Sequence, residues 1–260
     1  MALAKGVALI TGASQGIGRA IALRLASDGF DVALNDIPVH EALLKTTAQE
    51  VVAHGRRAHY VLADVSSEQE VETMVSDVVR VLGGLDVMVA NAGISIMKTF
   101  VETSAEDLDR ILAVNLRGTF LCYKYAGKQM IAQGRGGRII GACSTSGKQG
   151  QPSLSAYCAS KFGIRALTQC AALEFGSHGI TVNAYAPGPV KTSMWDYLEA
   201  GLGTPPGALE EQLSKAAALG RVGVPSDIAS LVSFLASKES YLITGQAVCI
   251  LAHHLLAPFD

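Results

Sequence analysis

A glycine-rich segment near the start of the chain limits the folds that this sequence can adopt. Residues 7–10 form an apolar run with the length of a buried strand, and Gly12, Gly16 and Gly18 follow it closely. A helical apolar pattern then continues to residue 28. A strand, a glycine turn and a helix in this order let the backbone approach a phosphate group at the amino end of the helix. The segment therefore favours a nucleotide-binding unit over a simple tight turn.

The same alternation of strand and helix patterns continues along the chain. Further apolar runs with strand character lie at residues 31–35, 58–63, 85–89, 138–142, 180–183 and 246–251. Hydrophobic residues make up 49% of the chain, which is enough to form a core. No linker or repeat interrupts the alternation of strands and helices. We predict a single doubly wound, Rossmann-type α/β domain over residues 1–260, with a mostly parallel sheet of about seven strands flanked by helices. Residues 188–220 are predicted to form a substrate-loop insertion.

Charge and composition argue against several kinds of binding partner and cellular location. The net charge is −2 and basic residues do not cluster, so neither nucleic acid nor a membrane surface is expected to bind. The five cysteines include no C-x-x-C pair, which argues against a disulfide framework. No signal peptide and no apolar run long enough to cross a bilayer is apparent. These features predict a soluble, cytoplasmic protein.

An acidic residue indicates which dinucleotide would bind. Asp36 closes the second predicted strand, near the place where dinucleotide folds hold an acid for the adenosine ribose. Its alternative interpretation is a turn residue before Pro38. A carboxylate here would repel a 2′-phosphate, no lysine or arginine follows closely, and Gln15 in the glycine loop is neutral. The sequence therefore favours NAD over NADP.

Two other polar residues each leave two interpretations open. Asp64 either approaches the adenine or is a turn residue ahead of Ser67-x-x-Glu70, which has the form of a helix capping box. Asn115 interrupts the apolar face of a long predicted helix, and is either a hydrogen-bonded core amide or a functional group.

Tyr157 and Lys161 carry the pattern most typical of proton transfer. Their spacing of four places both side chains on one helix face. An adjacent ammonium would lower the Tyr157 pKa and make the phenol a general acid or base. Ser144 follows the strand at 138–142, so it lies at the sheet edge where open α/β sheets bind ligands. Because tyrosine and lysine four apart are common on solvated helices, this interpretation depends on the other motifs.

Taken together, these motifs resemble those of the short-chain dehydrogenase/reductase family over nearly the whole chain. They are Thr11-Gly-x-x-x-Gly16-x-Gly18, Asn91-Ala92-Gly93, Asn115, Ser144, Tyr157-x-x-x-Lys161 and Pro187-Gly188. The resemblance implies an NAD(P)-dependent oxidoreductase that acts on CH-OH groups by transferring hydride between a nicotinamide and a secondary alcohol or ketone. It also implies a homotetramer or homodimer.

The resemblance assigns residues to three groups. The catalytic group is Asn115, Ser144, Tyr157 and Lys161. The cofactor group is Gly12, Gln15, Gly16, Ile17, Gly18, Asp36, Asp64, Val65, Asn91, Ala92, Gly93, Tyr157, Lys161, Pro187, Gly188, Val190 and Thr192. The substrate group is Ser144, Thr145, Gln151, Tyr157, Gly188 and Trp195. Gln151 and Trp195 have an equal alternative as surface or interface residues.

The implied roles in catalysis are specific. Tyr157 would pass a proton to or from the substrate oxygen, and Ser144 would hydrogen-bond that oxygen. Lys161 would bind the nicotinamide ribose and lower the Tyr157 pKa. Asn115 would hold a water molecule in the proton relay.

Within the family, stretches such as residues 188–195 look most similar to diacetyl/acetoin reductases, also called butanediol dehydrogenases. They suggest a vicinal hydroxyketone or diketone as substrate. The alternatives are a polyol or sugar-alcohol dehydrogenase, and a 3-oxoacyl-thioester reductase, which usually goes with NADPH. A non-catalytic nucleotide-binding protein would be expected to lose Tyr157 or Lys161, and both are present.

Two positions depart from the family pattern. Ala90 stands where the family usually has asparagine, and residues 251–260 replace the usual Asp-Gly-Gly with an apolar tail. The tail makes oligomer packing and substrate class harder to predict. His253 and His254 lie in it, but adjacent residues rarely converge on one ion, so we expect no metal site.

Overall fold

Parallel strands form the central layer of the protein. The computed structural model describes residues 4–192, 195, 205 and 207–250. Its strands are β1 (Val7–Thr11), β2 (Asp31–Asp36), β3 (Ala58–Leu62), β4 (Val87–Ala90), β5 (Gly137–Ala142), β6 (Ile180–Pro187) and β7 (Ala247–Ile250). They form a 7-stranded sheet in the order β3-β2-β1-β4-β5-β6-β7. Each neighbouring pair of these strands is parallel.

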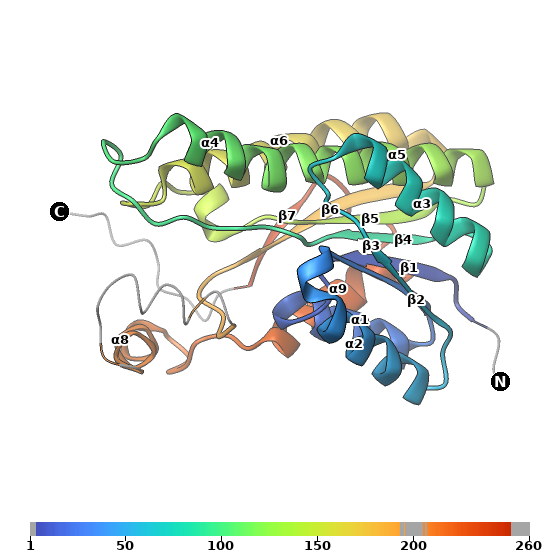
Figure 1. Ribbon diagram of the computed structural model, residues 1–260, viewed down its shortest axis with the longest axis horizontal. Coiled ribbons are helices and arrows are strands. Elements are labelled where there is room, and N and C mark those ends of the chain that lie inside the picture. Colours follow the sequence, from blue (N-terminus) through green and yellow to red (C-terminus); the bar gives the residue numbers. More distant parts are fainter. Residues whose placement is uncertain (1–3, 193–194, 196–204, 206, 251–260) are drawn as a thin grey trace.

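Helices cover both faces of the sheet (Figure 1). One face carries α1 (Gly16–Asp28), α2 (Glu41–Ala53) and α9 (Pro225–Ala236), and the other carries α3 (Glu68–Leu82), α4 (Ala105–Ile111), α5 (Gly118–Gln133) and α6 (Ser155–Phe175). Short turns of helix are η1 (Pro38–His40), η2 (Leu112–Arg117), η3 (Thr145–Gly147) and η4 (Gly176–His178). Among the described residues, helix α8 (Ala208–Ala216) lies apart from both layers, beyond the sheet edge.

The core consists of two apolar layers, one on each side of the sheet. Successive strand side chains point to opposite faces, so Leu9 and Met88 pack towards α3 and α5 while Ile10 and Val89 pack towards α1 and α9. These strand residues are fully buried. Burial of each such side chain stabilises the fold by about 1.5–3 kcal/mol. Because both faces are covered, the central strand β1 and its neighbour β4 are buried along their whole length.

The strand order reverses direction beside β1. The chain builds β1, β2 and β3 in one direction and then crosses back to place β4 on the other side of β1. The order therefore reverses between β1 and β4, and the carboxyl ends of such strands form the usual ligand-binding edge. This confirms the predicted doubly wound α/β fold with a seven-stranded sheet.

Two elements differ from the sequence prediction. β6 continues to Pro187 instead of ending at Asn183, because residues 184–187 pair with β7. The helix that carries Asn115 is interrupted by η2, a π-helical turn. The predicted insertion at 188–220 lies partly outside the described residues, and the tail at 251–260 lies wholly outside them. The domain boundaries therefore stay a prediction.

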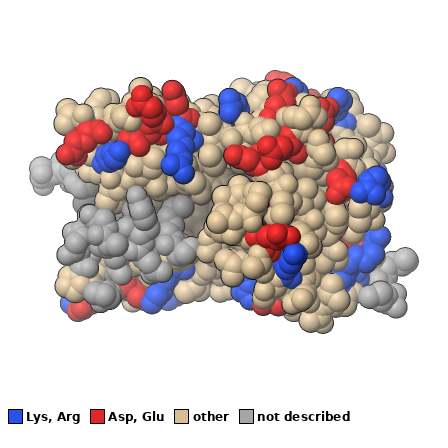
Figure 2. Space-filling view, viewed as in Figure 1, with Lys and Arg blue, Asp and Glu red and all other residues tan. Residues whose placement is uncertain are grey.

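The surface carries charges of both signs. On the face shown in Figure 2, acidic and basic side chains are interspersed over the helices. All five cysteines are free; Cys122, Cys143 and Cys158 are buried, and Cys170 and Cys249 are exposed. Among the described residues, no helix combines the length and apolar character needed to cross a membrane.

Candidate active site

The glycine loop between β1 and α1 requires glycine at specific positions. Gly12 and Gly16 have φ angles of +63° and +55°, in the left-handed region that favours glycine. A Cβ at Gly18 would collide with the carbonyl oxygen of Gly12. Helix α1 can therefore start close against the end of β1, with its amino end at the sheet edge.

This amino end fits a dinucleotide phosphate. Gln15 precedes α1 and makes no side-chain cap, and the first turn contains no acidic residue. The first amide groups of a helix lack helical partners, so here they are available to an anion. Beside them, the hydroxyl of Ser14 is buried and has no hydrogen-bond partner among the described residues. An unpaired buried hydroxyl is rare, and a bound polar ligand would satisfy it.

Asn91 ties the glycine loop to the middle of the sheet. Its Nδ2 donates to the carbonyl oxygens of Thr11 at 2.8 Å and Gly12 at 3.1 Å. Its Oδ1 accepts a 2.7 Å hydrogen bond from the buried hydroxyl of Tyr185. The backbone amides of Asn91 and Ala92 both donate to Thr11 Oγ1 at 3.0 Å. The ends of β1, β4 and β6 are thereby fixed relative to one another.

Asn115 is held by contacts on two sides. It lies in the π-helical turn η2 and is fully buried. Its side chain accepts from the amide of Ile94 at 2.8 Å and donates to the carbonyl of the same residue at 2.9 Å. Nδ2 also donates to Ser160 Oγ on α6 at 3.1 Å. This amide therefore connects the loop after β4 to the helix that carries Tyr157 and Lys161.

Ser144 and Tyr157 meet at the carboxyl edge of the sheet. Ser144 lies just beyond β5, and its hydroxyl accepts the Ser146 amide at 3.1 Å. Burial raises the pKa of Tyr157 to about 12, while a hydrogen bond with the Ser144 side chain opposes that shift. The phenol is therefore held protonated beside a second hydroxyl.

Lys161 lies under the same site with its ammonium group buried. Its side chain Nζ donates to the carbonyl of Ala142 at 2.7 Å and lies 5.3 Å from the Tyr157 ring centroid. Burial lowers its pKa to about 8. A Cβ on Gly93 would lie 3.3 Å from Asn115 Oδ1 and 3.5 Å from Lys161 Nζ, so only a glycine leaves this space open between the two side chains.

In this structure burial, and not Lys161, sets the direction in which the pKa of Tyr157 is shifted. The sequence predicts a lowered Tyr157 pKa, and burial instead raises it. The reason is that desolvation penalises the phenolate, and Lys161 stacks over the ring while its ammonium bonds to a backbone carbonyl. Helical spacing predicts that two side chains share a face, but it carries no information about burial.

Asp36 ends β2 beside the glycine loop. Its Oδ2 accepts the backbone amide of Ser14 at 3.2 Å, and its Oδ1 accepts the amide of Ile37 at 2.9 Å. Oδ1 also lies 2.9 Å from Nδ1 of His40. The carboxylate thus joins the loop after β1 to the turn after β2.

Asp64 makes the contacts of a turn residue. Its Oδ1 accepts the amide of Ser66 at 2.8 Å. Ser67 Oγ accepts the Glu70 amide as a helix cap, but the Glu70 carboxylate accepts the Asp64 amide instead of completing the predicted capping box. Val65 is buried, close to the position of a Cβ on Gly118.

The loop after β6 reaches back to the glycine loop. Pro187 ends β6, and the amide of Gly188 donates to the carbonyl of Ile250 at 2.9 Å. Val190 forms a bridge with Gly223. A Cβ on Gly16 would meet the Thr192 methyl carbon at 3.6 Å. Thr192 therefore closes over the amino end of α1.

The predicted substrate residues are placed unevenly. Thr145 directly follows Ser144 in η3 and is partly buried. Gln151 is exposed, and nothing in the described structure ties its side chain to the site. Trp195 is buried, and its amide donates to the carbonyl of Thr192 at 2.8 Å. The described residues contain no group of three or more His, Cys, Asp or Glu placed to hold a metal ion.

Comparison with known proteins agrees with this geometry. A family model described as enoyl-(acyl carrier protein) reductase matches residues 12–250. A short-chain dehydrogenase/reductase of Armillaria gallica is 69% identical over 93% of both chains. The L-2,3-butanediol dehydrogenase of Corynebacterium glutamicum is 43% identical over 94% of this chain and 96% of its own. The chain belongs to the short-chain dehydrogenase/reductase family. It is an oxidoreductase, and its family uses a nicotinamide cofactor.

A solved structure supports the same assignment of fold. The crystal structure of acetoin dehydrogenase from Enterobacter cloacae has a TM-score of 0.84 and 35% identity to this short-chain dehydrogenase/reductase, covering 96% of this chain and 95% of the other.

Several residues that build this dehydrogenase site were missed by sequence reasoning. They are Ser14, His40, Ile94, Ser160 and Tyr185. Ser160 lies between Tyr157 and Lys161 in the sequence, so its position next to these two residues could have indicated that it belongs to the site. Tyr185 is 94 positions from Asn91, and its role depends on the strand order.

The buried ammonium of Lys161 leads to a prediction about stability. The folded pKa of about 8 lies below the ordinary value of 10.5, so the unfolded chain binds more protons between these two pH values. Stability therefore rises with pH across this window. We expect Lys161→Met to be more stable than the wild type at pH 7, by up to roughly 3 kcal/mol, and the difference to shrink by pH 10.

Urea denaturation of both proteins at pH 7 and pH 10 measures this difference. Lys148→Met is the control, because Lys148 is exposed and its ammonium stays in water. A difference between the Lys161→Met and wild-type proteins that does not change with pH would contradict the prediction.

Proposed function

We propose that this protein is an NAD-dependent dehydrogenase that interconverts a small secondary alcohol and its ketone, with a vicinal hydroxyketone or diketone of the acetoin type as substrate. The observation that carries the proposal is the convergence of Ser144, Tyr157, Lys161 and Asn115 at the sheet edge next to the glycine loop. The 43% identity to a butanediol dehydrogenase supports the substrate class.

Tyr157 is the proposed general acid in ketone reduction. Its pKa of about 12 means that the phenol carries its proton at neutral pH and can give it to a substrate oxygen. The Ser144 hydroxyl lies beside it and would hydrogen-bond the same oxygen. When bound, the nicotinamide supplies or accepts the hydride. In the oxidation direction Tyr157 must first lose its proton, so alcohol oxidation should be favoured at higher pH.

Lys161 and Asn115 have proposed supporting roles. The Lys161 ammonium would bind the nicotinamide ribose. If this ammonium turned from the Ala142 carbonyl towards the Tyr157 hydroxyl, it would also favour the phenolate. Asn115 would orient the loop at Ile94 and hold a water molecule in the proton relay. Its two hydrogen bonds to Ile94 and one to Ser160 keep this amide in place.

The proposed coenzyme site uses the residues around the glycine loop. Gly12, Gly16, Gly18 and the start of α1 would bind the pyrophosphate, and Asp36 would accept hydrogen bonds from the adenosine ribose. A carboxylate at that position repels a 2′-phosphate, which supports NAD over NADP. Thr192 and Val190 would contact the carboxamide.

Other substrate classes are alternatives to the hydroxyketone. A polyol dehydrogenase would share most of the coenzyme site. A 3-oxoacyl-thioester reductase usually uses NADPH, so Asp36 argues against it. A protein that binds the nucleotide without turnover is disfavoured by the presence of all four catalytic residues. We further propose that the enzyme acts in the cytoplasm.

Replacing Tyr157 tests the proposed chemistry. Tyr157→Phe should reduce turnover by about 10²- to 10⁴-fold, because only the phenol proton is lost. NADH binding, measured by the fluorescence of the coenzyme, should persist. Tyr241→Phe is the matched control, since Tyr241 is 63% exposed on the surface and should retain full activity. Substantial residual turnover in Tyr157→Phe would defeat the assignment.

A small substrate panel tests the substrate class. Oxidation of NADH and NADPH would be followed by absorbance with diacetyl, acetoin, a ketose and an acetoacetyl thioester. We expect NADH turnover with diacetyl or acetoin. Activity with the ketose alone, or with the thioester and NADPH, would replace the proposed substrate by one of the alternatives.

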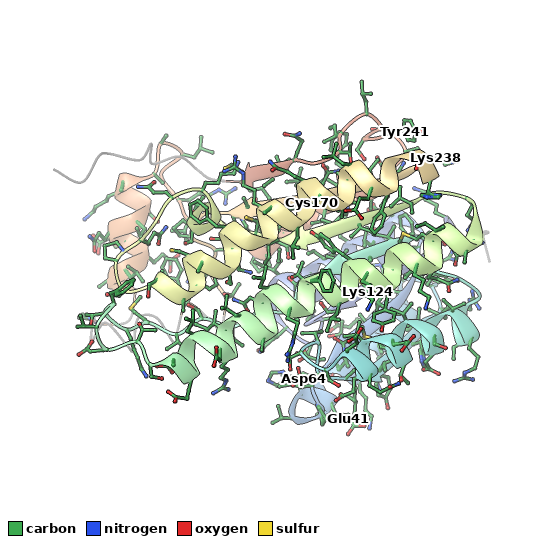
Figure 3. All side chains as sticks on the ribbon, turned by 90° about the horizontal axis from the view of Figure 1, so that it is seen from above. Glu41, Asp64, Lys124, Cys170, Lys238 and Tyr241 are labelled. Atoms are coloured by element: carbon green, nitrogen blue, oxygen red, sulfur yellow. The ribbon has the colours of Figure 1, made fainter. Side chains whose placement is uncertain are left out.

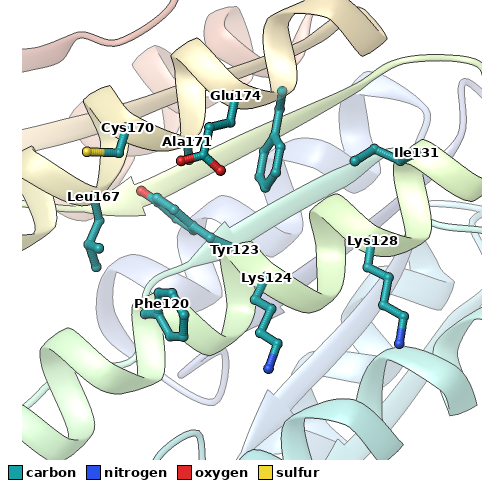
Figure 4. Close-up of a pocket in the computed structure, with 10 residues that line it drawn as sticks. Phe120, Tyr123, Lys124, Lys128, Ile131, Leu167, Cys170, Ala171 and Glu174 are labelled. Carbon is teal, nitrogen blue, oxygen red and sulfur yellow. The ribbon is translucent and has the colours of Figure 1, made fainter.

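The face formed by α5 and α6 supports a homo-oligomer. The two helices lie side by side, with Lys124 on one and Cys170 on the other (Figure 3). Between them runs a groove of about 440 Å³ with Phe120, Leu167 and Phe175 among its lining residues (Figure 4).

Exposed apolar surface beside this groove suggests a second copy of the chain as its occupant. The lysines of α5 in the lining already pair with α3 of the same chain, Lys124 with Glu68 at 2.6 Å and Lys128 with Glu72 at 4.0 Å. A two-fold axis would bring the apolar surface of one copy against the same surface of the other. Next to the groove, Leu173 on α6 is 86% exposed. We therefore propose that this face packs against its equivalent in a dimer or in a tetramer built from such dimers.

A charge at Leu173 tests this interface. Leu173→Asp should shift the protein towards monomer in sedimentation velocity experiments, because it places a charge in a desolvated apolar contact. Val52→Asp is the matched control, since Val52 is 58% exposed on α2, in the layer on the opposite side of the sheet. An unchanged sedimentation coefficient for Leu173→Asp would exclude this face as the interface.

A further inference from the structure

The turn after β2 brings a histidine back onto the acidic residue at the end of the strand. Pro38 starts the short helix η1, and the amide of His40 donates to the carbonyl of Ile37 at 3.0 Å. This bend places Nδ1 of His40 2.9 Å from Oδ1 of Asp36. The Asp36 side chain is 10% exposed and the His40 side chain 33% exposed. The imidazole is therefore in contact with both the carboxylate and water.

The carboxylate of Asp36 has little remaining acceptor capacity. Oδ1 accepts from the Ile37 amide and contacts His40, while Oδ2 accepts from the Ser14 amide. An ionised carboxylate offers about four acceptor sites. A ribose bound at Asp36 would therefore meet a carboxylate that is already in contact with His40. The net charge at this point and the number of free acceptor sites depend on the charge of His40 and on its contact with Oδ1.

The other ionisable side chains on the surrounding elements already have partners. On α2, Glu41 pairs with Lys45. Lys45 also lies over the ring of Tyr60 on β3. Arg19 of α1 pairs with Glu50 of α2.

At the end of β3, Asp64 accepts the Ser66 amide. Figure 3 shows Asp64 and Glu41 towards the same edge of the molecule. His40 is consequently the titratable group in direct contact with Asp36 among the residues that the structure describes.

We propose that His40 is a specificity residue that makes the choice between NAD and NADP depend on pH. This inference rests on the proposed function, in which Asp36 binds the adenosine ribose. An imidazole changes its charge between pH 5 and pH 8. Neutral His40 leaves the negative charge of Asp36 in place, which excludes a 2′-phosphate. Protonated His40 offsets that charge and adds a cation beside the 2′ position, so NADP binds more readily in acid.

Equilibrium binding tests this proposal without turnover. Isothermal titration calorimetry would give the dissociation constants of NAD⁺ and NADP⁺ at pH 5.5 and pH 8.5. The quantity compared is the ratio of the NADP⁺ constant to the NAD⁺ constant. Lowering the pH from 8.5 to 5.5 should reduce this ratio in the wild type, and the reduction should be about tenfold larger than in His40→Asn. The reason is that only the wild type gains a positive charge at residue 40 near the 2′-phosphate. The 2′-phosphate protonates equally in both experiments, so its contribution cancels.

Two further variants sharpen the comparison. His40→Lys carries a fixed positive charge and should show a low ratio at both pH values. His59→Asn is the matched control, because His59 also pairs with an aspartate, Asp77 at 2.6 Å, and belongs to the neighbouring strand β3. This control should keep the pH dependence of the wild type. The same pH dependence in His40→Asn and the wild type would overturn the proposal.

Asp36→Asn separates this inference from the proposed function. If this variant leaves the ratio at pH 8.5 unchanged, Asp36 does not meet the ribose and the coenzyme assignment itself fails. If Asp36→Asn lowers the ratio while His40→Asn behaves as the wild type does, the assignment stands and only the role of His40 is wrong.

Discussion

The side-chain amide of Asn91 is the interaction on which the site geometry depends. Parallel strands are hydrogen-bonded along their length, but their carboxyl ends open into loops whose backbone groups have no strand partners. Asn91 donates to two carbonyl groups of the glycine loop and accepts from Tyr185, so three strand ends become one rigid edge. The proposed catalytic side chains and the helix proposed to bind the pyrophosphate are placed relative to that edge. A dinucleotide bound as proposed would span both, so a rigid edge would align its two ends.

The fold was largely predictable because its signals are local. Each apolar run marks a strand, and glycines after several helices, such as Gly29 and Gly83, have the left-handed conformation of a helix end. The strand that extends to Pro187 could not be predicted in full, since Ala184 and Tyr185 pair with both β5 and β7 and the last two residues pair with β7. The π-helical turn at Asn115 left no recognisable mark in the sequence.

The grouping of Tyr157, Lys161 and Ser144 was predictable from the sequence, but the electrostatics of the site were not. Tyr157, Lys161 and Ser144 were found from spacing and strand position, and the structure does bring them together. The raised pKa of Tyr157 was not predictable, because it depends on burial by segments far away in the sequence. Asp64 shows the same limit: its contact with Ser66 favours the turn interpretation, which the sequence had left open against an adenine contact.

The π-helical turn η2 has a consequence for the length of the chain. Such a turn is equivalent to one residue inserted into an α-helix, and each residue rotates a helix by about 100°. It lets α4 bury Ile111 and α5 bury Leu121 while Asn115 still points at the loop containing Ile94. Removing one residue between 112 and 117 would restore a regular helix and turn one of these faces away from the sheet. The number of residues between 112 and 117 is therefore fixed by packing on both sides of the turn, and the side chain of Asn115 is fixed by its hydrogen bonds.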